Sequence, residues 1–251
     1  MQNLNKSTIH ITKRISDSGL CSRRDAKALI FAEKVKVNDE LITNPAIKVS
    51  EEDSINVDGK LLVFSNARPR LWLYHKPAGL ITTHKDPKNR QTVFANLPKN
   101  MPRVVSVGRL DLDSEGLLLL TDKGDLARYF ELPQNKMPRQ YKVRVFGDVD
   151  MKRLQTLKRG CIIGGIRYSK IEIKFLSSIK SNSWLEVLLY EGKNREIRKV
   201  LEHFGLQVSR LIRTQYGPYL LGDLPPGKTK EVVITEEIYE NYCRQAKRQE
   251  D

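Results

Sequence analysis

The chain has 251 residues, of which 39% are apolar and 29% are charged, a composition typical of a folded globular protein and not of a disordered one. Lysine and arginine number 44 against 30 acidic residues, so the formal net charge is +14 and polyanions are the expected partners. No apolar run reaches the roughly 18 residues that a membrane helix needs, so no association with a membrane is expected.

The N-terminal residues and the cysteines bear on the cellular compartment. The first residues, MQNLNKSTIHITKR, lack the apolar core of a secretory signal, so export is not expected. Cys21, Cys161 and Cys243 are isolated and form no CxxC pair. They indicate a reducing compartment, the cytoplasm, and give no sign of a zinc site or a disulfide framework.

The N-terminal quarter of the chain is polarised in charge. Basic residues predominate in residues 6–36 and acidic residues in residues 37–66. The basic part predicts two short helices, the second of which follows Ser22, a favourable N-cap with Asp25 three residues later. The acidic part predicts short strands joined by turns at Asn38-Asp39 and Asp58-Gly59.

This pattern resembles an S4 domain, a small RNA-binding module, over about residues 9–63. The resemblance rests on GLCSRRDA at the helix start, the VKVND turn and the closing DSINVDG. It implies that several basic side chains contact RNA, mainly phosphates, which position an RNA without reading its sequence: Arg14, Arg23, Arg24 and Lys27. We therefore expect an S4 domain at 1–64, a polar linker at 65–70 (SNARPR) and a second domain at 71–251.

The second domain is predicted to be rich in strands. Strand-like runs outnumber helical stretches and many follow one another directly, which favours an α+β fold with a largely antiparallel sheet. The strand-like runs, in chain order, are LWLYH, RVVSVG, GLLLLT, YKVRVFG, YSKIEIKFL, SWLEVLLY and VSRLIRTQYG. The helical stretches are DLARYFEL, VDMKRLQTLKR and NREIRKVLEHFG, and the tail TEEIYENYCRQAKRQED predicts a last helix.

An acidic cluster lies in GRLDLDSEGLLLL, where Asp111, Asp113 and Glu115 alternate before four leucines. The spacing is similar to the front of a calcium-binding EF-hand loop, but the twelfth position is Asp122 instead of glutamate, and a strand precedes the loop. Calcium is therefore disfavoured. Asp113 and Glu115 are predicted to be surface residues and Leu110 and Leu112 core residues, whereas Asp111 is a candidate for a tuned carboxylate at the rim of the core.

GRLDLDSEGLLLLTDKGDLA resembles the catalytic motif of RNA pseudouridine synthases that carry an N-terminal S4 domain. YHKPAGLITTHKDPKNRQTVFANLP, RQYKVRV and EGKNREIRKVLEHFGLQVSRLIRTQYG agree, so the resemblance extends to about residue 235. It is closest to the large-subunit ribosomal RNA pseudouridine synthase B group. It implies isomerisation of a uridine by cleavage of C1′–N1 and rejoining through C5, without cofactor or metal, in large-subunit ribosomal RNA or an assembly intermediate, by a monomer.

The resemblance also implies roles for individual residues. Asp111 is the catalytic carboxylate, which would stabilise or bond to the positive charge that develops at C1′. Arg198, at the edge of an apolar helical stripe, is expected to pair with Asp111, whereas Arg195 and Lys199 are expected to point away from that stripe. Tyr141 is expected to stack on the displaced base. Further residues are expected to line the RNA path: Lys76, Arg109, Arg195, Arg210 and Arg213.

Three alternatives stay open. The same chemistry could act on small-subunit ribosomal RNA. The chain could be a non-catalytic S4-type assembly factor, although Asp111, Tyr141 and Arg198 are all present. A glycosidase would need a second carboxylate placed as acid or nucleophile and a sugar-binding aromatic surface, which two tryptophans inside strand-like runs do not suggest.

Overall fold

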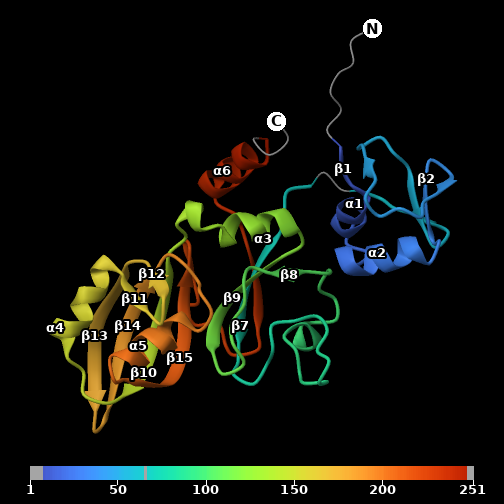
Figure 1. Ribbon diagram of the computed structural model, residues 1–251. Coiled ribbons are helices and arrows are strands. Elements are labelled where there is room, and N and C mark those ends of the chain that lie inside the picture. The colour runs from blue at the N-terminus through green and yellow to red at the C-terminus, as the bar shows by residue number, and fades with distance from the viewer. Residues whose placement is uncertain (1–7, 65–66, 248–251) are drawn as a thin grey trace.

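The computed structural model describes residues 8–64 and 67–247, so part of the expected linker, residues 65–66, lies outside the described residues. The chain folds into a small N-terminal lobe and a larger lobe built on a long sheet, seen side by side in Figure 1. No helix in the described part of the chain is long and apolar enough to span a membrane.

The N-terminal lobe packs two helices on short strands, as the sequence predicts. Helix α1 (Ile11–Asp17) and helix α2 (Arg23–Phe31) share a core with strands β2 (Val35–Val37) and β5 (Ile55–Val57). The Ser22 hydroxyl accepts a hydrogen bond from the Asp25 amide at 3.1 Å, which confirms the predicted N-cap. The other strands are β1 (Ile9–His10), β3 (Glu40–Leu41), β4 (Lys48–Val49) and β6 (Lys60–Leu61).

Both predicted turns of this lobe are present. Asn38 and Asp39 join β2 to β3 with φ of 49° and 70°, and Asp58 and Gly59 join β5 to β6 with φ of 53° and 79°. Two-residue turns with two positive φ angles match the twist of antiparallel strands, and Asn, Asp and Gly are the residues that adopt them most readily.

The larger lobe contains a 9-stranded sheet in the order β13-β14-β10-β15-β9-β7-β17, with β8 and β16 attached to its middle. Every pairing is antiparallel except that of β9 with β15, so the predicted α+β fold with a largely antiparallel sheet is confirmed. The strands are β7 (Leu71–Lys76), β8 (Val105–Ser106), β9 (Glu115–Thr121), β10 (Arg139–Phe146), β13 (Ile171–Ile179), β14 (Asn182–Leu189), β15 (Gln207–Tyr216), β16 (Tyr219–Leu220) and β17 (Thr229–Val232). A separate hairpin joins β11 (Cys161–Ile163) and β12 (Ile166–Tyr168).

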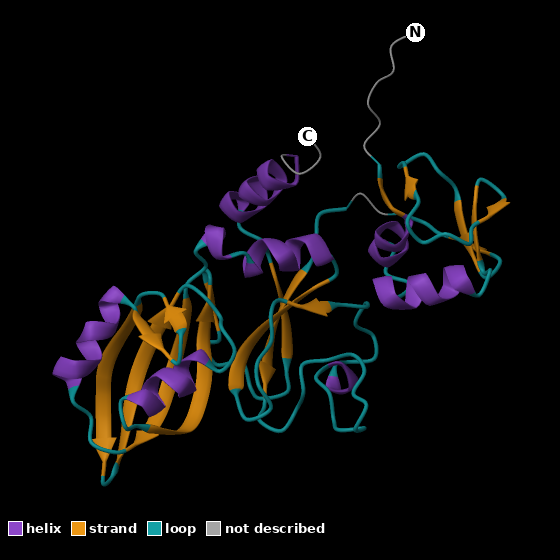
Figure 2. Ribbon diagram, in the orientation of Figure 1, coloured by secondary structure: helices purple, strands orange, loops and turns teal. Residues whose placement is uncertain are grey.

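Strand β9 is buried on both faces, which explains its unbroken run of leucines. Leu118 and Leu120 belong to a core that also contains α5 (Glu196–His203) and the short helix α4 (Met151–Leu154). The intervening Leu117 and Leu119 belong to a second core beneath α3 (Gly124–Glu131) and α6 (Glu236–Lys247). Figure 2 shows α3 and α6 on one side of the middle strands, and α4 and α5 beside the half of the sheet that is distant from the N-terminal lobe. Three 3-10 turns complete the lobe: η1 (Phe94–Asn96), η2 (Pro133–Asn135) and η3 (Gln155–Arg159).

The parallel pairing of β9 with β15 depends on Gly116. This residue lies opposite Arg213 of β15 with φ of +100°, and a Cβ atom built on it would lie 2.3 Å from the Arg213 carbonyl oxygen. Only glycine permits this approach and this backbone conformation. The close contact brings the loop that precedes β9, which carries Asp111, beside β15.

Ion pairs connect the lobes within the described residues. Lys13 Nζ of α1 lies 2.7 Å from Asp125 Oδ2 of α3, and Lys85 Nζ lies 2.7 Å from Asp25 Oδ1 in the first turn of α2. The second pair places the N-terminal turn of α2 against the loop that follows β7. The lobes therefore enclose a space between them.

Candidate active site

A cleft of about 1510 Å³ lies between the two lobes. Its lining includes Asp111 and Tyr141 together, which the sequence resemblance had assigned to one site. Arg23 and Arg24 of the N-terminal lobe line the same cleft, as do Arg109, Arg195 and Arg213 of the larger lobe. Arginines from both domains thus face a space that also contains a carboxylate and an aromatic ring.

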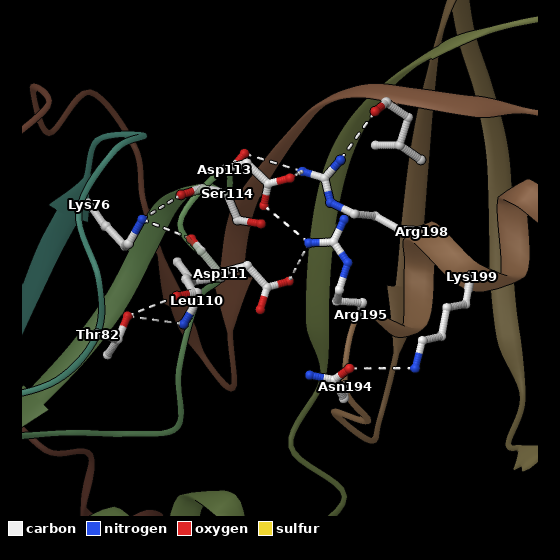
Figure 3. A network of polar contacts seen from close by, with 11 residues as sticks. Lys76, Thr82, Leu110, Asp111, Asp113, Ser114, Asn194, Arg195, Arg198 and Lys199 are labelled. Carbon is white, nitrogen blue, oxygen red and sulfur yellow. Dashed lines mark hydrogen bonds and ion pairs between the residues drawn. The ribbon is translucent and has the colours of Figure 1, made fainter. Parts of the chain in front are cut away.

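Hydrogen bonds to its main chain fix the loop that carries Asp111 (Figure 3). Lys76 Nζ, at the end of β7, donates hydrogen bonds to the carbonyl oxygens of Pro77 at 3.1 Å, Asp111 at 3.0 Å and Ser114 at 2.8 Å. The Thr82 hydroxyl donates to the Leu110 carbonyl at 2.9 Å and lies 3.3 Å from the Leu110 amide. The Asp111 side chain itself remains 37% exposed.

Lys76 is fully buried, so the prediction that it contacts RNA is wrong. Its three N–H groups match three main-chain acceptors, and none points to the surface. Burial lowers the pKa of Lys76 to about 8, although the nearby carboxylates of Asp111, Asp113 and Glu115 act in the opposite direction. Lys76 is therefore a structural cation of the Asp111 loop.

The arginine pairing differs from the prediction. Arg198 does not pair with Asp111: its Nη2 lies 3.1 Å from Asp113 Oδ2, and it also donates to the carbonyls of Val208 and Asp113. The arginine beside Asp111 is Arg195, whose Nη1 lies 3.8 Å from Asp111 Oδ2 and 3.5 Å from Asp113 Oδ1.

The reason lies at the start of α5. The helix begins at Glu196, and Arg195 precedes it in a left-handed conformation with φ of 52°, so the helical periodicity used in the prediction does not apply to Arg195. Its side chain instead crosses to the Asp111 loop, as Figure 3 shows.

The other two acids of the cluster also have partners. Glu115 accepts two hydrogen bonds from Arg210, at 2.8 and 2.9 Å, and this contact lowers the pKa of Glu115. Asp113 contacts both Arg195 and Arg198. Asp113 is exposed, as predicted for a surface residue, whereas Glu115 is half-buried; the ion pairs of both acids with arginines were not predicted. Leu110 is buried as expected, but Leu112 is 44% exposed and is not a core residue.

The remaining basic candidates fall into three groups. Arg23, Arg24 and Arg109 are exposed and line the cleft. Arg213 lines it too but is buried, and its Nε donates to the Leu117 carbonyl at 2.7 Å. Arg14, Lys27 and Arg210 lie outside the cleft lining: Arg14 stacks on Phe64 at 3.9 Å, Lys27 lies 5.5 Å from the Phe31 ring, and Arg210 binds Glu115.

Sequence reasoning missed several residues of the cleft. Glu196 is 4% exposed, its Oε2 accepts from the Lys193 amide at 2.9 Å, and burial raises its pKa to about 7. His84 stacks on Phe94 and lines the cleft. The position of Glu196 next to the apolar stripe was a possible signal of its burial, whereas nothing in the sequence marks the ring pair. The described residues include no group of three or more His, Cys, Asp or Glu side chains that could hold a metal ion.

Comparison with known proteins agrees with the resemblance found in the sequence. The family model for RNA pseudouridylate synthase matches residues 70–203, and the model for the S4 domain matches residues 12–55. An uncharacterized RNA pseudouridine synthase of Rickettsia felis is 52% identical over 222 residues, which cover 88% of this chain and 96% of that protein. Ribosomal large subunit pseudouridine synthase B of Pasteurella multocida is 39% identical over 235 residues, which cover 91% of this chain and 68% of the relative.

A solved structure supports the fold. A crystal structure of a pseudouridylate synthase superimposes with a TM-score of 0.63 at 21% identity and covers 93% of this chain and 99% of the other. The matches to both family models and the identity to the relatives together assign the family. The chain belongs to the RNA pseudouridine synthases that carry an N-terminal S4 domain, and it is an isomerase that acts on uridine in RNA.

Proposed function

We propose that this enzyme isomerises a uridine of large-subunit ribosomal RNA and that Asp111 is its catalytic carboxylate. The observation that carries the proposal for Asp111 is the contrast among the three acids of the cluster. Asp113 and Glu115 have arginine nitrogens at 3.1 and 2.8 Å, whereas the Arg195 nitrogen that pairs with Asp111 is 3.8 Å away. Of these three acids, Asp111 is the one that lines the cleft.

The chemistry requires a carboxylate in this position. The C1′–N1 bond of uridine breaks, the base turns, and C5 bonds to C1′; N1 gains a proton and C5 loses its hydrogen to solvent. Positive charge develops on the sugar as the first bond breaks, and an adjacent carboxylate stabilises it or bonds to it. Arg195 lies between Asp111 and Asp113, with its Nη1 3.8 Å from Asp111 Oδ2 and 3.5 Å from Asp113 Oδ1, so it would help to hold the Asp111 carboxylate at the cleft.

Tyr141 and Arg198 complete the proposed catalytic group. Tyr141 lies on β10 and lines the cleft, although only 8% of its surface is exposed, and a displaced base that enters the cleft would meet it there. Arg198, whose side chain is 12% exposed, acts by holding Asp113 and the Asp111 loop through its two contacts with Asp113.

The proposal for large-subunit RNA rests on the relatives. Those of Pasteurella multocida and Haemophilus influenzae, 39% and 37% identical, carry the name ribosomal large subunit pseudouridine synthase B. Naked RNA and an assembly intermediate are both candidate substrates. Arg23 and Arg24 would bind phosphates at one side of the cleft. The proposed S4 domain comprises residues 1–64 and the proposed catalytic domain residues 71–251. We also propose that the enzyme acts as a monomer in the cytoplasm.

The test uses transcripts of both ribosomal RNAs labelled with tritium at uridine C5, because isomerisation releases that hydrogen to solvent. We expect release from the large-subunit transcript with the natural chain and none with Asp111→Asn, which should bind the transcript within severalfold of the natural affinity. Release from the small-subunit transcript alone would overturn the proposed substrate. Release by Asp111→Asn at the natural rate would overturn its catalytic role, and no release from either transcript would point to an assembly intermediate or a binding protein.

A further inference from the structure

A stacked pair of rings lies in the loop that follows β7. The His84 and Phe94 ring centroids are 3.5 Å apart with an interplanar angle of 14°, and both residues line the cleft. Phe94 begins the one-turn helix η1, seen in Figure 2 below the N-terminal lobe, and is partly buried against the main core. His84 is exposed, so Phe94 covers one face of the imidazole and the other face is accessible.

The loop is fixed before any ligand binds. Main-chain bonds from Ile81 to Gln91 at 3.0 Å and from Val93 to Ile81 at 2.9 Å close its base. Arg90 forms two side-chain hydrogen bonds with Asp86, at 3.0 and 2.7 Å, across its tip. A preformed ring surface loses little conformational freedom when a ligand stacks on it.

The electrostatic state of the histidine suits stacking. Partial burial of its ring lowers the pKa of His84, and the nearby Arg103 lowers it further, against a hydrogen bond with the Val104 backbone; both effects favour the neutral imidazole. Every nucleobase has a π-face, and stacking on a side-chain ring is therefore tolerant of sequence.

The ring pair lies where the two lobes meet. Lys85, adjacent to His84, forms the ion pair with Asp25 in the first turn of α2, and Arg23 and Arg24 of that turn line the same cleft as Asp111. An RNA strand that contacts these arginines and reaches Asp111 passes this loop.

We propose that His84, backed by Phe94, is a stacking site for an unpaired nucleobase of the RNA strand outside the target uridine. This inference rests on RNA being the substrate and adds a second base-binding position to the proposed function. The Phe94 ring limits access to one face of the imidazole, so the site holds one base.

The test measures binding of two single-stranded probes by the full chain: a fluorescent RNA decamer of adenosines, and a decamer with the same backbone but no bases. Neither probe contains uridine, so no turnover occurs and the result does not depend on the tritium assay. We expect His84→Ala to bind the adenosine decamer roughly 5- to 150-fold more weakly, the range that loss of one stacked base gives. Its affinity for the abasic decamer should change less than about twofold, with the same salt dependence, because phosphate contacts are intact.

Two variants control the experiment. His84→Phe keeps a flat ring and should bind adenosines within about threefold of the natural chain. His203→Ala removes an exposed histidine that meets Phe204 edge-on at 5.6 Å and does not line the cleft, and it should bind both probes normally. Unchanged binding by His84→Ala, equal losses for both probes, or failure of His84→Phe to retain affinity would each overturn the proposal. The thermal midpoints of all three variants should match that of the natural chain, since both histidines are exposed.

Discussion

Replacement of Lys76 by methionine tests whether this buried cation holds the Asp111 loop. Methionine keeps much of the apolar stem but removes all three N–H donors, which leaves the carbonyls of Pro77, Asp111 and Ser114 without this partner. Hydrogen bonds from a charged donor contribute about 1.5–3 kcal/mol each, and the cost of burying the ammonium group offsets part of their sum. Three buried acceptors left unsatisfied at about 1–3 kcal/mol each would cost about 3–9 kcal/mol, and removal of the buried ammonium group offsets part of this, so we expect the free energy of unfolding to fall by about 3–5 kcal/mol.

The assay is thermal unfolding combined with tritium release. At roughly 2–4 °C per kcal/mol for a domain of this size, the midpoint of the catalytic domain should fall by roughly 6–20 °C. The rate should fall as well, even at temperatures where the variant remains folded, because the Asp111 main chain loses its anchor. Lys174→Met is the matched control: its Nζ lies 3.3 Å from Glu186 at the surface, and such a pair contributes about 0–1 kcal/mol. A Lys76→Met midpoint equal to that of Lys174→Met would refute this reasoning.

Three further variants test other parts of the structure. Gly116→Ala should destabilise the chain by about 2–5 kcal/mol in denaturant titration, since its Cβ would lie 2.3 Å from the Arg213 carbonyl at a φ of +100°, whereas Gly124→Ala, with nothing within 4 Å, should cost almost nothing. Glu196→Gln should flatten the pH dependence of stability. The natural carboxyl group, whose pKa is raised to about 7 in the folded chain, stabilises the fold fully below its ordinary pKa of 4.5, and this stabilisation is lost as the pH rises through about 7. The thermal midpoint of the natural chain should therefore decline over this pH range, and that of Glu196→Gln should not. Asp113→Asn should bind single-stranded RNA roughly two- to fivefold more tightly and with a steeper salt dependence, because Arg195 and Arg198 lose a neutralising partner; weaker binding at low salt would contradict this.

Local sequence patterns predicted most of the fold. Ser22 identified the start of α2 because an N-cap needs only the residues that follow it. The four leucines predicted a buried strand, since both faces of β9 are covered and no polar position interrupts the run. Where the chemistry of a few neighbouring residues determines the structure, the prediction and the structure agree.

The contacts of the site were less predictable because they join distant segments. Lys76 binds main-chain carbonyls 35 and 38 residues away, and carbonyls have no identity in a sequence. Arg198 has Asp113 as its partner because β15 and β9 are parallel neighbours, which helical periodicity within α5 cannot show. Arg195 has a left-handed backbone just before the helix, so helical spacing could not indicate that its side chain reaches Asp111 and Asp113.

In the structure, the contacts that position the Asp111 main chain are separate from the Asp111 carboxylate, for which we propose the catalytic role. Lys76 and Thr82 hold the loop through the main chain of Leu110, Asp111 and Ser114, so the Asp111 carboxylate contributes none of these hydrogen bonds. A carboxylate held by its own oxygens would have to exchange those bonds for contacts with a substrate. Here the Asp111 side chain is 37% exposed and lines the cleft, while hydrogen bonds hold the main chain of the loop. A site of this kind can present a negative charge in a defined place without first breaking a contact, which is the preorganisation that stabilisation of a developing positive charge requires.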